Sequence, residues 1–319
     1  MTDVGKLLAN ALQGRIADIA RLLSIVENEE PEAAEVIRAT FADTGRATLV
    51  GLTGPPGAGK STLTSALTAA YRKTGARVAI VAVDPSSPYT GGAILGDRIR
   101  MRDRFLDEGV FIRSMANRGV PGGLARATRR VIGLLDALGF DVVLVETVGV
   151  GQQDIEVARV VDTVCLLTIP GAGDDIQAIK AGIIEIADVL VVNKADRPGA
   201  DDAARDLTKM LGLGPPRLGW RTPVVKTSAL NGDGIPELTE AIRRHREWGA
   251  ACGEARKRAV DAMRSEVKVL LRERVLRDLE RTLDERGLEE VVARVADKSL
   301  DPYGAVDALL GHEKARSHD

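Results

Sequence analysis

The chain has 319 residues, of which 45% are hydrophobic and 28% are charged, and its formal net charge at pH 7 is −2. This composition is typical of a globular protein with a full core, and the small net charge argues against a nucleic-acid-binding protein, which would need a positive field. No run of about 18 apolar residues occurs, so we expect no membrane-spanning helix, and the charge-interrupted N-terminus is unlike a secretory signal.

The cysteine content excludes two further classes of protein. The sequence contains two cysteines, Cys165 and Cys252, which lie far apart. Neither a disulfide framework nor a cysteine-based zinc site is therefore indicated. We expect a protein that works in the cytoplasm.

Residues 1–45 are predicted to form an N-terminal helical segment. Leucine and isoleucine recur at helical spacing between Leu7 and Leu23. A further helix is expected from about Pro31 to Phe41, because the apolar residues there follow the same period.

Residues 46–250 alternate short β-branched runs with helical stretches, which predicts a separate domain. Continuous apolar strands divided by helices indicate a parallel sheet that is covered on both faces. We therefore predict an α/β fold with a doubly wound, mostly parallel sheet. The expected strands are 47–53, 77–83, 110–114, 141–146, 163–169, 188–193 and 223–227. The expected helices are 60–73, 122–138, 154–160, 174–187, 200–211 and 235–248.

Residues 251–319 are predicted to form a C-terminal helical arm. Apolar residues from Val260 to Leu283 follow steps of three and four, which indicates one long helix over residues 254–285. Two short helices are expected at 287–297 and 302–310. The apolar stripe of the long helix must be covered, either by its own domain or by a second subunit. We favour the second arrangement, a homodimer.

Residues 54–61 read GPPGAGKS and follow the first expected strand. This is the phosphate-binding pattern G-x-x-x-x-G-K-[ST] in its required setting of strand, glycine-rich turn and helix. The backbone N–H groups of such a turn and the helix N-terminus attract phosphates, while Lys60 reaches the outer phosphates and Ser61 can hold Mg²⁺. The expected nucleotide-binding residues are Gly54, Gly57, Ala58, Gly59, Lys60, Ser61 and Thr62, with Lys60 also catalytic.

The strand expected at 188–193 ends in the N-K-x-D pattern of Asn193, Lys194 and Asp196. An aspartate carboxylate can accept from the N1–H and N2–H₂ donors of guanine, whereas adenine would leave it unpaired. Asn193 can brace the neighbouring loops, and the stem of Lys194 can lie over the base. The loop that follows the last strand adds Ser228, Ala229 and Leu230 as a base-edge segment. GTP or GDP is therefore the expected nucleotide.

Three acidic residues are candidate metal ligands near the phosphates. Glu146 ends the strand at 141–146, where P-loop proteins usually carry an aspartate that supports the Mg²⁺ shell. Asp84 ends the strand at 77–83 and can approach Mg²⁺, although an Asx turn before Pro85 is an alternative. Asp97 closes a glycine-rich segment that could reorder around nucleotide.

Two further residues are candidates for the hydrolytic step. Gly149 follows the strand of Glu146, where its backbone N–H could meet the terminal phosphate. Gln152 or Gln153 could orient an attacking water, although glutamines on a loop are often simply solvated. We assign Gly149 and Gln152 as catalytic candidates.

Five strings of the sequence resemble the MeaB/ArgK family of GTPases, bacterial relatives of the human methylmalonic aciduria type A protein. They are GLTGPPGAGKST at 51–62, VDPSSPYTGGAILGDRIRM at 83–101, VETVGVGQQD at 145–154, IPGAGDDIQAIKAGI at 169–183 and NKAD at 193–196. The resemblance covers essentially the whole chain. It implies a SIMIBI-class GTPase, with Asp84, Asp97 and Glu146 around Mg²⁺ and an additional switch at 171–180. Asp174 and Asp175 of that switch could instead cap a helix.

The resemblance also implies a partner and a role. The protein would homodimerise through its C-terminal arm and bind an adenosylcobalamin-dependent acyl-CoA mutase, most often methylmalonyl-CoA mutase, gating cofactor loading and protecting the enzyme from inactivation. Three alternatives remain: a GTP-dependent metallochaperone, a transport-related kinase and a scaffold that merely binds GDP. A metallochaperone would need clusters of Cys and His ligands, and the three histidines, His245, His312 and His318, are dispersed.

Overall fold

The computed structural model describes residues 2–84, 107–116, 123–147, 160–171, 181–213, 219–282 and 285–316. The chain forms two compact units, Met1–Arg258 and Ala259–Asp319. The first contains the sheet and the N-terminal helices, and the second contains most of the long helix expected from the sequence.

The N-terminal segment folds into short helices. They are α1 (Val4–Leu12), α2 (Ile16–Glu27), α3 (Ala33–Thr40) and the 3₁₀ turn η1 (Phe41–Asp43). The apolar pattern from Leu7 to Leu23 is divided by Gly14, whose φ of +86° favours glycine. The helical period therefore continues across a break that separates α1 from α2.

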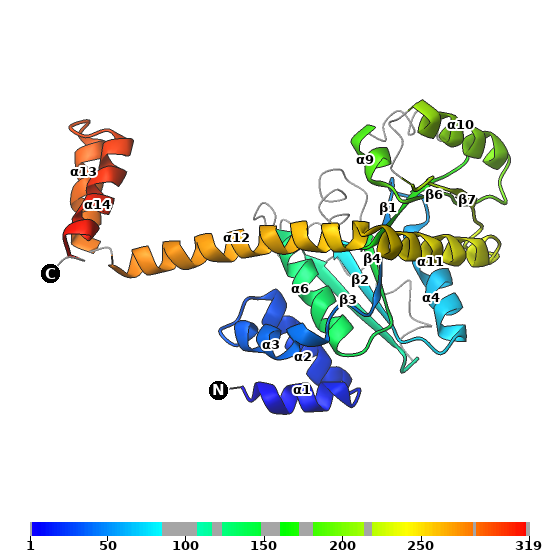
Figure 1. Cartoon of the computed structure of the whole chain (residues 1–319), viewed down its shortest axis with the longest axis horizontal. Coiled ribbons are helices and arrows are strands. Elements are labelled where there is room, and N and C mark those ends of the chain that lie inside the picture. Colours follow the sequence, from blue (N-terminus) through cyan, green and yellow to red (C-terminus); the bar gives the residue numbers. More distant parts are fainter. Residues whose placement is uncertain are drawn as a thin grey trace. The chain divides into compact units, whose positions relative to one another are not determined.

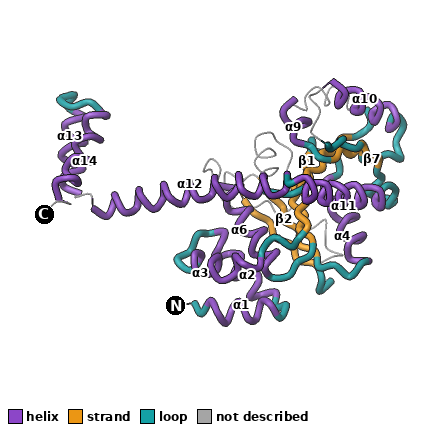
Figure 2. The backbone as a smooth tube through the Cα atoms, viewed as in Figure 1, coloured by secondary structure: helices purple, strands orange, loops and turns teal. Residues whose placement is uncertain are grey.

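A seven-stranded sheet occupies the centre of the first unit, within the described residues, and every pairing in it is parallel. The strands are β1 (Thr48–Thr53), β2 (Val78–Asp84), β3 (Val110–Ala116), β4 (Val142–Thr147), β5 (Thr163–Thr168), β6 (Val189–Val192) and β7 (Val224–Lys226). Their order is β3-β2-β4-β1-β5-β6-β7, and the strands appear in orange in Figure 2. Each predicted strand is present.

Helices cover both faces of this sheet (Figure 1). The helices that the structure describes between β1 and residue 253 are α4 (Lys60–Lys73), α6 (Gly123–Ala137), α9 (Ala181–Ile186), α10 (Ala200–Leu213) and α11 (Ile235–Cys252). Alternate residues of β4 show the division: Val142 and Leu144 pack in one cluster with α4 and α11, whereas Val143 and Val145 pack in another with α6. Because both faces are buried, Val142 to Val145 form a continuous apolar run within β4.

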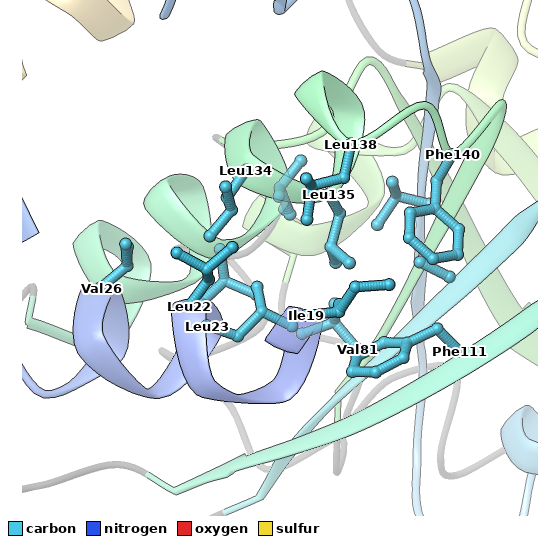
Figure 3. Packing of buried hydrophobic residues seen from close by; sticks show 14 of the residues in the cluster. Ile19, Leu22, Leu23, Val26, Val81, Phe111, Leu134, Leu135, Leu138 and Phe140 are labelled. Carbon is cyan, nitrogen blue, oxygen red and sulfur yellow. The ribbon is translucent and has the colours of Figure 1, made fainter. Parts of the chain in front are cut away.

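The N-terminal helices extend the core on the α6 side of the sheet. Ile19, Leu22, Leu23 and Val26 of α2 lie against Leu134 and Leu135 at the end of α6 and against Leu138 just after it, beside Phe111 and Phe140 (Figure 3). Residues 1–45 therefore pack as part of the first unit.

The C-terminal helices are α12 (Glu254–Thr282), α13 (Glu285–Ala296) and α14 (Pro302–Arg316). Helix α12 spans 29 residues and bears exposed apolar side chains along its length, at Val260, Met263, Val267, Leu270, Leu271, Val275 and Leu276. In the part of the chain that the structure describes, no helix is long and apolar enough to cross a membrane.

The predicted fold class is confirmed: the sheet is doubly wound and parallel, with C-terminal helices after it. Strand β1 lies between β4 and β5. Strands β2 to β4 therefore lie on one side of β1 in the sheet, and strands β5 to β7 lie on the other side. In open α/β sheets, ligands bind beyond the carboxyl ends of the strands at such a switch point. Glu146 near the end of β4 and the motifs after β1, β6 and β7 all lie at this edge.

Candidate functional site

The loop between β1 and α4 has the backbone that a phosphate-binding turn requires. Gly54, Gly57 and Gly59 have φ values of +145°, +79° and +89°, which an L side chain rarely adopts. A Cβ at Gly54 would lie 2.4 Å from the Leu167 carbonyl oxygen, so β5 leaves room for glycine alone. Gly59 is the N-cap of α4, and the loop therefore ends at the positive end of a helix dipole.

Lys60 lies folded over this loop. Its side chain is buried, and Nζ donates to the carbonyl oxygens of Gly54 at 2.8 Å and Pro55 at 3.1 Å. An ammonium held against loop carbonyls is poised to exchange them for phosphate oxygens, which are charged and therefore stronger acceptors.

Ser61 and Glu146 meet behind the phosphate loop. The Ser61 hydroxyl donates to Glu146 Oε1 at 2.5 Å, although the two residues are 85 positions apart. Glu146 is the fifth residue of β4 and is 6% exposed. The strand pairing of β1 with β4 accounts for the approach, since Leu52 is in register with Glu146 and the loop begins two residues later.

This pair fits a magnesium site. Mg²⁺ prefers oxygen ligands and is usually bound through one or two carboxylates together with substrate phosphates, so a carboxylate beside the P-loop hydroxyl is a suitable donor set. Among the described residues, no group of three or more His, Cys, Asp and Glu side chains could hold a metal ion. A metal held partly by nucleotide phosphates does not need such a group.

Asn193 joins the N-K-x-D segment to the phosphate loop. Its Nδ2 donates to the Ala58 carbonyl at 2.8 Å, and its Oδ1 accepts from the Thr227 hydroxyl at 3.1 Å and from the Ala229 N–H at 3.3 Å. Asn193 is buried, and these contacts satisfy its amide group from two loops. The side chain therefore fixes the distance between the phosphate loop and the base-edge loop.

Lys194 also connects the N-K-x-D segment to the phosphate loop, through a contact that is exposed to solvent. Its Nζ donates to the Gly57 carbonyl at 2.7 Å, and its φ of +57° is unusual for a residue with a side chain. Backbone strain of this kind persists where neighbouring contacts hold it, and it often occurs at functional sites. The Lys194 stem is thus held alongside the phosphate loop.

Asp196 is exposed, and its carboxylate is oriented by Ser228. The Ser228 hydroxyl donates to Asp196 Oδ1 at 2.7 Å, and this hydrogen bond is the main cause that lowers the pKa of Asp196. The carboxylate is therefore charged at neutral pH and available as an acceptor. Ser228 itself is held by its N–H, which donates to the Asp233 carbonyl at 3.0 Å, and Leu230 of the same loop is 86% exposed.

The structure brings most of the sequence-predicted residues to one edge of the sheet. Those from the phosphate loop, β4, the N-K-x-D segment and the loop after β7 are connected by the contacts above. Thr62 is exposed on the first turn of α4, and Asp84 is the last residue of β2. Asp97, Gly149, Gln152 and Gln153 lie outside the described residues, as do residues 172–180.

Three residues of the described site belong to no sequence motif that would predict their role. Thr64 of α4 donates from Oγ1 to Glu146 Oε2 at 3.0 Å, and Thr227 supports Asn193. Gly234 has a φ of +72°, and a Cβ there would lie 1.9 Å from the Lys226 carbonyl oxygen, so the turn beneath Ser228 requires glycine. A buried threonine at an apolar helix position has the pattern of a core residue, so the sequence alone does not mark Thr64 as part of the site.

Comparison with protein families gives a match over most of the chain. The model for the family described as methylmalonyl-CoA mutase-associated GTPase MeaB matches residues 19–284. This range contains the phosphate loop, Glu146, the N-K-x-D segment and nearly all of α12.

Similar proteins are found in several organisms. A Pyrococcus abyssi protein, provisionally named a GTPase, is 46% identical over 310 residues, covering 96% of each chain. The GTPase ArgK of Escherichia coli is 41% identical over 238 residues, covering 72% of each chain. The mouse mitochondrial methylmalonic aciduria type A homologue is 36% identical over 272 residues, which is 84% of this chain and 66% of the mouse protein.

A solved structure has the same fold. The crystal structure titled LAO/AO transport system kinase superposes with a TM-score of 0.72 at 28% sequence identity. The match covers 98% of this chain and 99% of the other.

Proposed function

The chain belongs to the MeaB family of methylmalonyl-CoA mutase-associated GTPases, and from this premise we propose that it is a Mg²⁺-dependent GTPase that regulates an adenosylcobalamin-dependent acyl-CoA mutase. The observation that carries the proposal is the Asn193 bridge. Its 2.8 Å bond to Ala58 joins a phosphate-binding loop to a guanine-recognition segment 135 residues away.

The phosphate loop binds the nucleotide's phosphates in this proposal. The loop N–H groups from Gly57 to Thr62 surround the β-phosphate, and Lys60 exchanges its carbonyl contacts for the outer phosphates. Because Lys60 already lies against the loop, little rearrangement of the backbone is needed.

Asp196 selects guanine over adenine. Its charged carboxylate accepts from N1–H and N2–H₂, while Ser228 holds one of its oxygens and fixes the direction of the group. Lys194 covers one face of the base with its stem, and the N–H of Ala229 and the exposed Leu230 border its edge. An adenine in this position would leave a charged acceptor unpaired, which is a costly mismatch.

Ser61 and Glu146 hold Mg²⁺, with Asp84 and Asp97 as further candidates for its shell. Bound Mg²⁺ would neutralise the charge that develops on the phosphates during hydrolysis. Gly149 would meet the terminal phosphate, and Gln152 would orient the attacking water.

The output of the switch is binding to a mutase, and the family description points to methylmalonyl-CoA mutase. The GTP- and GDP-bound forms would bind the mutase with different affinity, which is the condition for nucleotide to gate cofactor loading and protect the enzyme. We place this activity in the cytoplasm, where GTP is available.

The C-terminal helices form a homodimer interface in the proposal. Val267 and Leu271, one turn apart on α12, are each 61% exposed, and further apolar residues continue the stripe. A helix with such a stripe is stabilised when a second helix covers it. Sedimentation of the wild type should show a dimer, and V267E with L271E together should give a monomer that still binds GDP. K268E, an exposed change on the same helix, is the matched control; a double variant that stays dimeric would refute the interface.

Hydrolysis measured with and without purified mutase tests the switch. We expect free phosphate as the product from GTP, little turnover of ATP, and a faster rate when methylmalonyl-CoA mutase is added. Lys60→Ala should abolish turnover. Transfer of phosphate to an acceptor would favour the kinase activity named for the similar structure, and a rate that the mutase leaves unchanged would contradict the proposed partner.

A further inference from the structure

Helix α4 contacts both oxygens of the Glu146 carboxylate. Ser61 donates to Oε1 at 2.5 Å and Thr64 donates to Oε2 at 3.0 Å. The two hydroxyls are three positions apart and therefore lie on the same side of the helix. Glu146 is 6% exposed and Thr64 is fully buried, so the second contact lies beneath the carboxylate, away from solvent.

The two hydroxyls differ in what they can do. Ser61 belongs to the nucleotide-binding motif and is half-buried at the start of the helix. Thr64 has no exposed surface with which to reach a nucleotide or a metal ion. Its hydroxyl can act on the site only through the two groups that it contacts, the Glu146 carboxylate and the Lys60 carbonyl.

A glutamate at this strand end needs such a contact more than an aspartate would. P-loop proteins usually carry an aspartate here, and glutamate has one more methylene and one more rotatable bond. Freezing that additional freedom on metal binding costs entropy, unless the carboxylate is already held in place. The Thr64 hydroxyl holds Oε2 and leaves Oε1 on the Ser61 side, facing the phosphate loop.

From this geometry we propose that Thr64 is a positioning residue for the magnesium site: it fixes the Glu146 carboxylate and thereby sets the affinity of the nucleotide-bound protein for Mg²⁺. The inference rests on the proposed function, in which Glu146 and Ser61 hold the metal. Residues that orient metal ligands typically change metal affinity by about 10- to 100-fold when they are removed.

The same helix provides a matched control. Thr68 is also fully buried, and its hydroxyl donates to the Thr64 carbonyl at 2.8 Å, just as Thr64 approaches the Lys60 carbonyl at 3.0 Å. If Thr64 only bonded to the preceding turn of the helix, then substitution of Thr64 and substitution of Thr68 should affect Mg²⁺ affinity equally. If Thr64 positions Glu146, then only substitution of Thr64 should lower the affinity for Mg²⁺.

The test measures Mg²⁺ binding by the full-length protein with a fluorescent GDP analogue. We expect Thr64→Val, which removes the hydroxyl at nearly constant volume, to raise the Mg²⁺ concentration for half-maximal tightening of GDP by about 10-fold. Thr64→Ser, which keeps the hydroxyl, should restore it to within about threefold. Thr68→Val should match the wild type, and GDP affinity without metal should be unchanged in all three variants.

A double-mutant cycle with Glu146→Asp adds a second measurement. The shorter side chain withdraws the carboxylate from Thr64, so Thr64→Val should have less effect in that background than in the wild type. Equal Mg²⁺ dependence in Thr64→Val, Thr68→Val and the wild type would overturn the inference and leave the proposed function standing. A wild type whose GDP binding does not respond to Mg²⁺ would overturn both.

Discussion

Arg258, in the first turns of α12, pairs with the fully buried carboxylate of Asp188, the residue that precedes β6. Its Nη2 lies 3.1 Å from Asp188 Oδ1, and its Nη1 lies 3.3 Å from Oδ2. The Val164 N–H donates to Oδ2 at 2.9 Å, and His245 Nε2 lies 3.2 Å from Oδ1. These contacts hold the first turns of α12 to the amino ends of β5 and β6. This edge of the sheet is opposite the candidate nucleotide site.

Removing the guanidinium should destabilise the first unit. Arg258→Ala leaves Asp188 buried with weaker partners, and we expect a loss of about 2 kcal/mol in the free energy of unfolding. Arg243→Ala is the control, because Arg243 pairs with Glu240 and Glu247 on the exposed side of α11 and should contribute nothing measurable. Urea titration of both variants checks this. Equal stability of the two would show that the buried pair does not anchor the helix.

Lowering the pH should reduce the free energy of unfolding, because the Asp188 carboxylate becomes protonated. Burial alone would raise the pKa of Asp188, but the contacts from His245 and Arg258 outweigh it and hold the pKa at about 2. Since the folded pKa lies below the unfolded one, the stabilisation is complete above about pH 5 and is lost as pH falls towards 2, a total of about 2–3 kcal/mol.

Asp188→Asn isolates this contribution. The wild type should be more stable than the variant at pH 7, and the difference should shrink as the pH is lowered from about 5 to 2. The difference is the quantity to measure, because burial raises the pKa of the nearby Asp162 and so contributes in the opposite direction. A difference that stays constant across this range would contradict the assignment.

Changing Asp196 should change the base that the protein accepts. In Asp196→Asn, an amide replaces one of the two acceptors, so guanine loses a partner while xanthine, which has a carbonyl at C2, gains a donor. We expect GDP affinity to fall by about 100-fold or more and xanthosine diphosphate to bind better than GDP. Fluorescence competition with both nucleotides checks this. Unchanged GDP affinity would remove Asp196 from base recognition.

Gly59 should resist substitution more than an equivalent glycine elsewhere. A Cβ at Gly59 would lie 2.5 Å from Asn193 Nδ2, whereas Gly75, with a similar φ of +84°, has nothing within 4 Å. Both alanine variants carry the strain of a left-handed backbone, roughly 1–2 kcal/mol. Gly59→Ala should lose about 1–3 kcal/mol more, because the clash displaces a buried amide, and it should also weaken GDP binding. Thermal unfolding and GDP titration of the two variants make the comparison.

The strands could be predicted from the sequence because they are buried on both faces. All six residues of β4 are buried, and the first four, Val142 to Val145, form an uninterrupted apolar run with no competing helical period. The boundary between α1 and α2 could not be predicted in the same way. The apolar period continues on both sides of Gly14, so periodicity alone predicts one helix, although the left-handed backbone of Gly14 divides it.

The contacts of the candidate site also differ in how far the sequence predicts them. The phosphate loop and Asn193 carry local patterns, and their juxtaposition follows once the parallel sheet is inferred. The Thr64–Glu146 and Arg258–Asp188 contacts carry no such pattern, since each joins common residue types 82 and 70 positions apart. Their formation depends on the angle at which a helix lies on the sheet, which periodicity does not specify.

The central claim is that the loop after β1 and the segment after β6 together form a guanine-nucleotide site. Calorimetric titration of the nucleotide-free, full-length protein with GDP and with ADP in the presence of Mg²⁺ tests it most directly. We expect one GDP to bind per chain, with a preference over ADP of about 100-fold or more, and Lys60→Ala to weaken that binding. Equal affinity for the two nucleotides, or no binding of either, would contradict the account.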